Sequence, residues 1–76
     1  MTFADWLKSK RARSGLSLIA LANEVGTSDA QISRLETGQR RPSYEITIAL
    51  ARKFGDDPRK VLKLAGYTVL ETANAG

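Results

Sequence analysis

Apolar residues recur at helical spacing in the first half of the chain. Leu18, Leu21, Ala22 and Val25 lie at positions i, i+3, i+4 and i+7, which would place them on one face of a short helix. Ser17 stands just before this stripe, and its side chain can accept a hydrogen bond from a backbone N–H of the first turn. The pattern therefore predicts a short amphipathic helix that begins after Ser17.

A second amphipathic helix follows after a short turn. Gly26 stands where the first helix should end, and glycine readily adopts the left-handed conformation found at helix C-termini. Ser28 and Gln31 have the spacing of a capping box, which marks a helix start. Ile32 and Leu35 then supply the apolar face of this helix. The predicted order is helix, tight turn, helix.

The opposite face of the second helix carries small and polar side chains at helical spacing, namely Ala30, Ser33, Arg34 and Thr37. Such a face packs poorly against a core, but it suits contacts with base edges in the major groove of DNA. Arg34 is the main candidate for direct readout, because bidentate bonding to guanine requires an arginine that projects outward.

Some residues near this face have two interpretations. Ala30 is either an ordinary helix former or a contact for a thymine methyl group. Asp29 either complements the positive end of the helix or accepts a hydrogen bond from a cytosine amino group. The hydroxyl groups of Ser17, Thr27 and Ser28 are caps first, and they or nearby backbone N–H groups are also candidates for phosphate contacts.

Three more helices and no strand are predicted from caps and apolar spacing. They run over about residues 2–13, 44–54 and 57–66, on either side of a helix-turn-helix at about residues 17–36. No repeat, low-complexity tract or linker divides the chain. We therefore expect a single all-α domain of five helices over residues 1–76.

The length and composition of the chain exclude several classes of protein. A domain of 76 residues buries only ~60% of the surface of its unfolded chain, so a partner subunit would help to stabilise it. The chain has no cysteine and no histidine, which removes disulfides, thiolate metal sites, the commonest general base and the commonest zinc ligand. Paired carboxylates, metal-ligand spacings and a glycine-rich phosphate loop are also missing. We expect neither an enzyme nor a bound cofactor or metal.

The hydropathy of the chain indicates where in the cell the protein is expected. No apolar run approaches the ~20 residues that span a bilayer, and the N-terminus has no apolar signal-peptide core. The expectation is a cytoplasmic protein without membrane contact.

Positive charge is concentrated beside the two central helices. Twelve lysine and arginine residues against eight acidic ones give a net charge of +4, which suits a polyanionic partner. One cluster comprises Lys8, Lys10, Arg11 and Arg13, and the other is Arg40–Arg41. Either cluster alone would be an ordinary solvated helix face. Because both flank the helix-turn-helix, we expect phosphate contacts from members of each.

The helix-turn-helix residues also stand in a family pattern. This pattern has a small residue at the helix crossing, then a turn glycine and two inward apolar residues. In this chain they are Ala22, Gly26, Ile32 and Leu35. Further matches are Leu7, Arg11, Gly15-Leu16-Ser17, Leu21-Ala22, Ile32-Ser33, Leu35-Glu36, Gly38 and Arg41-Pro42-Ser43. With these residues the chain resembles the Cro and phage-repressor type of helix-turn-helix, the XRE family. It departs from the family at Leu18, where the family usually has a glutamine that touches a phosphate.

The resemblance implies a five-helix, lambda-repressor-like fold and a transcriptional regulator that binds double-stranded DNA. We expect a homodimer that reads two half-sites of a palindromic operator, ~34 Å apart, and that represses by occluding a promoter. The residues expected to read bases are Asp29, Ala30, Gln31, Ser33 and Arg34. The residues expected to contact phosphates are Ser17, Thr27, Ser28, Arg40, Arg41, Lys10 and Arg13. Gln31 also has an interpretation as a capping-box partner alone.

Two charged residues occupy positions at which the helical pattern predicts apolar residues. Arg11 lies on the apolar side of the first helix, and Glu36 falls near the inward edge of the third. We expect them to form an internal ion pair, and the family resemblance implies the same pairing.

The end of the chain is predicted to form the dimer. The fifth helix and the residues after it, about 58–70, are too apolar for a monomer of this size to cover, and such a patch usually marks an interface. The residues expected there are Val61, Leu64, Tyr67, Val69 and Leu70, with residues 71–76 as a flexible tail. Trp6 is expected to pack in the core or in a dimer, and the alternative is a platform on which a base stacks.

An alternative class of function stays open. Antitoxins of toxin-antitoxin pairs use the same fold and bind their own promoter. In that case the apolar segment from Val61 to Leu70 would bind a toxin instead of a second copy.

Overall fold

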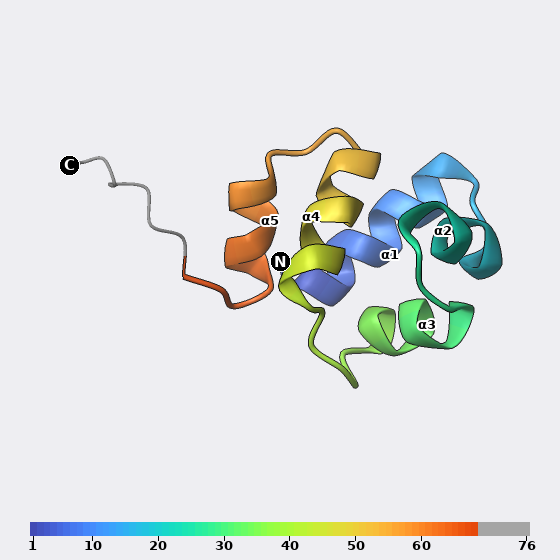
Figure 1. Cartoon of the computed structure of the whole chain (residues 1–76), viewed down its shortest axis with the longest axis horizontal. Coiled ribbons are helices and arrows are strands. Elements are labelled where there is room, and N and C mark those ends of the chain that lie inside the picture. Colours follow the sequence, from blue (N-terminus) through green and yellow to red (C-terminus); the bar gives the residue numbers. More distant parts are fainter. Residues whose placement is uncertain (69–76) are drawn as a thin grey trace.

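The computed structural model describes residues 1–68, which form five α-helices and contain no strand (Figure 1). The helices are α1 (Phe3–Ser14), α2 (Leu18–Val25), α3 (Asp29–Thr37), α4 (Tyr44–Lys53) and α5 (Pro58–Leu64). The predicted all-α class and the five helices are confirmed, and their bounds differ from the expected ones by only one or two residues.

Each helix begins at a side-chain cap. The side chains of Thr2, Ser17, Ser28, Ser43 and Asp57 each accept a hydrogen bond from a backbone N–H two or three residues further on. A cap of this kind stabilises a helix by ~1 kcal/mol, since it satisfies one of the four N–H groups that lack a partner at a helix start. Local chemistry therefore fixes where the helices start, which is why the sequence predicts their bounds well.

The turn between α2 and α3 depends on Gly26. This residue has a φ of 80°, and its N–H together with that of Thr27 bonds to the carbonyl oxygen of Ala22. The turn directs α3 across α2, and α3 packs against both α1 and α2.

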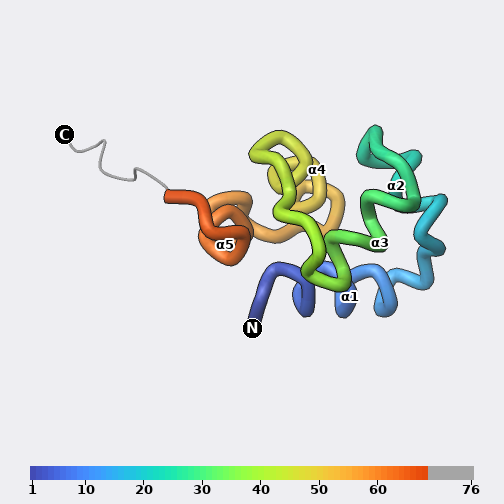
Figure 2. Tube along the Cα trace, turned by 90° about the horizontal axis from the view of Figure 1, so that it is seen from below, coloured from blue at the N-terminus to red at the C-terminus, as the bar shows by residue number. Residues whose placement is uncertain are grey.

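The five helices share one core. Leu7, Leu21, Ile32, Leu50 and Val61 come from α1 to α5 in turn, and each is at most 1% exposed. Figures 1 and 2 both place α2 and α3 at one end of the molecule and α5 at the other, with α1 and α4 between them. The third helix therefore lies far from the end of the described chain.

The burial of Val61 corrects one expectation about the dimer interface. The side chain is 1% exposed and belongs to the core of the single chain, so it has no surface left for a partner subunit. Leu64 and Tyr67 are half-buried against the same core. Val69, Leu70 and the predicted tail, 71–76, lie outside the described residues.

Trp6 ties the start of the chain to the loop before α5. It is buried between Phe3 and Phe54, and its indole N–H donates a 2.7 Å hydrogen bond to Asp56. The expectation that Trp6 packs in the core is confirmed. Lys10 bonds to the same carboxylate.

Within residues 1–68, none of the helices has the length and apolar character that crossing a bilayer requires.

Candidate nucleic-acid interface

The outward face of α3 is open to solvent. Ile32 and Leu35 hold the helix in the core, with 0% and 4% exposure. On the other side Asp29, Ala30 and Arg34 are exposed, and no described residue bonds to the guanidinium of Arg34. The structure thus brings three of the five expected base-reading residues together on one exposed surface.

Gln31 and Ser33 lie at the edge of this face and are half-buried. The backbone N–H of Gln31 donates to Ser28 Oγ at 3.2 Å, which forms half of the predicted capping box. The reciprocal bond is missing, because the buried Gln31 Oε1 has no partner among the described residues. A buried acceptor left unpaired costs ~1–3 kcal/mol. The capping-box interpretation therefore accounts for the backbone of Gln31 but not for its side chain.

The two serines expected to contact phosphates serve as caps in this structure. Ser17 Oγ accepts from the N–H of Ala20 at 3.0 Å, and Ser28 Oγ accepts from Gln31. Both serines are exposed at helix N-termini, where backbone N–H groups and the helix dipole favour an anion. Thr27 is half-buried, and its N–H is already bonded within the turn.

Arg11 and Glu36 form the expected ion pair between α1 and α3. Arg11 Nη2 donates to Glu36 Oε1 at 3.0 Å, and Arg11 Nε donates to Glu36 Oε2. Arg11 Nη1 also donates to the carbonyl oxygen of Leu16 at 3.0 Å. The Glu36 side chain is only 7% exposed, and its hydrogen bond raises the pKa of Arg11 further above the ordinary value. The pair therefore fixes α3 against α1, and the Leu16 contact adds the residues just before α2.

The two arginines after α3 differ in their surroundings. Arg40 is exposed, and no described residue bonds to its side chain. Arg41 donates from Nε to the carbonyl oxygen of Ala65 at 3.2 Å and from Nη2 to that of Gly66 at 3.1 Å. Its guanidinium also lies over the Tyr67 ring, 4.1 Å from the centroid. Of these two arginines, Arg40 can therefore bind a phosphate without losing a contact within the described chain.

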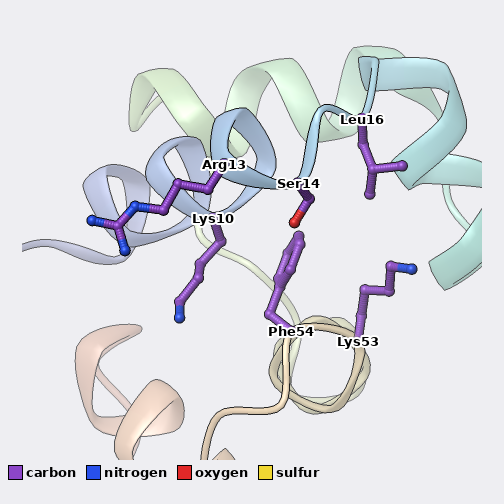
Figure 3. Close-up of a pocket in the computed structure, with 6 residues that line it drawn as sticks. All are labelled: Lys10, Arg13, Ser14, Leu16, Lys53 and Phe54. Carbon is purple, nitrogen blue, oxygen red and sulfur yellow. The ribbon is translucent and has the colours of Figure 1, made fainter.

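Lys10 and Arg13 lie away from the α3 face. With Lys53 and Phe54 they line a surface pocket of about 360 Å³ between α1 and the end of α4, to which α3 contributes no residue (Figure 3). Lys10 is paired with Asp56 at 3.2 Å. Their positive charge lies near the C-terminal ends of two helices, where cations balance the helix dipoles. The structure does not bring these two residues together with the other expected phosphate contacts.

Two polar side chains that shape this region make contacts that the predictions from sequence do not include. Tyr67 donates from its hydroxyl to the carbonyl oxygen of Pro42 at 2.7 Å, and Thr47, which is 0% exposed, donates to that of Ser43 at the same distance. Thr47 stands among apolar residues of its helix, so the sequence could have indicated a buried polar group at this position. The Tyr67 contact joins residues 25 positions apart, and no periodic pattern indicates it.

Comparison with known proteins agrees with the fold. A family model described as a helix-turn-helix domain matches residues 2–64. The chain is also similar to a protein of Pyrobaculum aerophilum named as an HTH-type transcriptional regulatory protein, with 34% identity over 58 residues. These residues are 76% of this chain but 23% of that protein, so the chain spans less than a quarter of the length of this relative.

Proposed function

Because the chain belongs to the helix-turn-helix domain family, we propose that it binds double-stranded DNA with α3 in the major groove and regulates transcription. The observation that carries the proposal is the exposed polar face of α3, with Arg34 at its centre and no partner for its guanidinium among residues 1–68. A helix with its side chains is about 10–12 Å across, which matches the ~12 Å width of the major groove. The name of the P. aerophilum relative supports the regulatory role.

Base reading is assigned to α3. Arg34 donates two hydrogen bonds to a guanine, and Ala30 contacts a neighbouring base through its methyl group. Asp29 and Ser33 flank these two and bond to adjacent bases. Gln31 is the fifth reader, since rotation of its amide toward a base would give its unpaired Oε1 a donor.

Phosphate contacts fix the register of α3. Just beyond the C-terminus of α3, Arg40 supplies a cation that no residue of the described chain binds. Ser17, Thr27 and Ser28 surround the N-termini of α2 and α3. Leu18 stands at the first residue of α2, so a side-chain hydrogen bond to phosphate is not made from that position. Arg40 is therefore the principal electrostatic contact of this interface.

The finer proposal is a homodimeric repressor of the Cro and phage-repressor type, the XRE family. Since α5 lies at the opposite end of the fold from α3, two copies joined near α5 would leave both α3 helices uncovered (Figure 1). A two-fold pair would read a palindrome and gain affinity through high effective concentration. Leu64 and Tyr67, with Val69 and Leu70, are the proposed contacts, and repression results from occlusion of a promoter.

The test is selection of bound sites from a random DNA pool, followed by titration of the selected duplex at two salt concentrations. We expect an enriched palindromic sequence, two protein chains per site, and binding that weakens with salt. An enriched but asymmetric site bound by one chain would overturn the dimer and keep the DNA-binding role. Failure to enrich any sequence would overturn the base-reading function. A stable complex with a second, unrelated protein that covers the end near α5 would favour the antitoxin alternative.

A further inference from the structure

The loop between α3 and α4 is held by the chain that follows α5. The loop covers residues 38–43 and carries Arg40, and its hold consists of contacts from residues 65–67. Arg41 donates to the carbonyl oxygens of Ala65 and Gly66, while Tyr67 donates to that of Pro42. We call this group of contacts the Arg41–Tyr67 clamp.

The contacts of the clamp share the same two side chains. The Arg41 guanidinium satisfies two carbonyl oxygens just beyond the end of α5, a helix terminus that favours positive charge. The same group stacks on Tyr67, whose hydroxyl in turn bonds next to Arg41 at Pro42. Tyr44, the first residue of α4, packs its ring edge against Tyr67 at 5.5 Å between centroids. Loss of one contact therefore loosens the others.

We propose that Arg41 and Tyr67 are positioning residues for DNA binding: the clamp fixes the α3–α4 loop so that Arg40 meets a phosphate. The inference rests on the proposed DNA-binding function. It assigns Arg41 a role inside the protein, not on the DNA backbone. It also makes DNA affinity depend on residues 65–67, which lie after the last helix and have no direct part in reading bases.

A direct phosphate contact by Arg41 is the competing explanation, and it predicts different results. A cation that leaves the DNA backbone lowers the slope of log affinity against log salt by about 0.9. A positioning residue weakens binding to all sequences because a looser loop must be ordered when DNA binds, while Arg40 still reaches its phosphate and the slope stays about the same. Removal of the Tyr67 hydroxyl tests the clamp, because that hydroxyl bonds to Pro42, and it leaves in place the ring that the proposed dimer would contact.

The experiment compares Tyr67→Phe, Arg41→Ala and the double variant in the full chain, with Tyr44→Phe as the matched control. The control also loses one phenol hydroxyl but keeps the ring contact with Tyr67. Hydrogen exchange of the free protein over residues 38–44 reports the loop, and titration of the selected duplex at several salt concentrations reports DNA binding. Thermal unfolding checks that each variant remains folded.

We expect Tyr67→Phe to speed exchange in the loop and to weaken binding of all sequences about two- to tenfold, with an unchanged salt slope. The double variant should bind about as well as Arg41→Ala, since both changes break one clamp. Unchanged loop exchange and affinity in Tyr67→Phe would overturn the proposal, as would a slope lowered by about one unit in Arg41→Ala alone. If the parent protein binds no DNA, the proposed function fails, while loop exchange still decides whether the clamp holds the loop.

Discussion

The indole N–H of Trp6 donates a 2.7 Å hydrogen bond to the carboxylate of Asp56, a residue 50 positions further along the chain. This bond, and then the bond from Lys10, hold the pKa of Asp56 below its usual value despite partial burial. The contact fixes the loop between α4 and α5 to α1, and it links the stability of the fold to pH.

Acid should weaken this contact. A carboxylate with a lowered pKa in the folded state stabilises the protein above the pKa of the unfolded chain, and this contribution is lost as pH falls through the folded value. We therefore expect Asp56→Asn to melt below the parent at pH 6, and the difference to shrink below about pH 4. Thermal unfolding between pH 2 and pH 7 measures this, with Asp5→Asn as an exposed control. A constant difference across this range would contradict the assignment.

The Arg11–Glu36 pair should be costly to break from one side. Glu36→Ala leaves the Arg11 guanidinium without its carboxylate, and loss of one partner of a buried pair costs ~3–5 kcal/mol. Since Arg11 is 21% exposed, we expect the lower end, about 3 kcal/mol, which for a domain of this size shifts Tm by ~12 °C or more. Arg11→Met combined with Glu36→Leu should recover part of the loss. Equal Tm values for the parent, Glu36→Ala and Arg11→Met alone would show that the pair contributes nothing.

Arg34→Ala should relax base preference at one position of each half-site. The expected loss there is ~1–3 kcal/mol, because one bidentate contact with guanine disappears. Repeated selection from a random pool with the variant checks this. Arg52→Ala removes the same charge from an exposed position on α4 and should leave the base preference intact. If both variants kept the parental preference at every base of the site, Arg34 would read no base.

Arg40→Ala should act on all sequences alike. Loss of one phosphate contact should weaken specific and random duplexes by the same factor and reduce the salt slope by about 0.9. The measurement is a titration of both duplexes at 50–200 mM salt. If the variant lost affinity only for the selected site, Arg40 would be a base contact instead.

The dimer proposal predicts the effect of Val69→Ser with Leu70→Ser. The two changes replace apolar side chains of the proposed dimer contact with polar ones. Sedimentation should show loss of the dimer, and DNA titrations should become less steep. Retention of a dimer with parental affinity would move the interface to other surfaces, with the exposed Tyr44 as the next candidate.

The sequence predicts those parts of the fold that local chemistry decides. The cap at Ser28 and the inward pair Ile32 and Leu35 lie within one short helix, so spacing alone finds both the helix and its buried face. The Arg11–Glu36 pair was predictable although its members lie 25 positions apart along the chain. Each charge interrupts an apolar helix face, and a charge that is buried there requires an oppositely charged partner.

The contacts around Arg41 leave no such pattern. Arg41 looks like a surface cation in the sequence, and only the folded chain brings Ala65, Gly66 and Tyr67 to its guanidinium. Val61 looks like an excess apolar residue, yet α5 turns it into the common core. Whether an apolar or charged side chain is satisfied within one chain depends on the packing of all five helices, which helical spacing does not encode.

The turn at Gly26 has a consequence for chirality. Its φ is 80°, while a Cβ built at this position would meet no atom within 4 Å. The obstacle to other residues is therefore handedness and not room: an L side chain of any size incurs ~1–2 kcal/mol at such a φ. A D residue has the mirror-image preference. Alanine at position 26 should therefore weaken the turn without any clash, whereas a D residue would favour this φ.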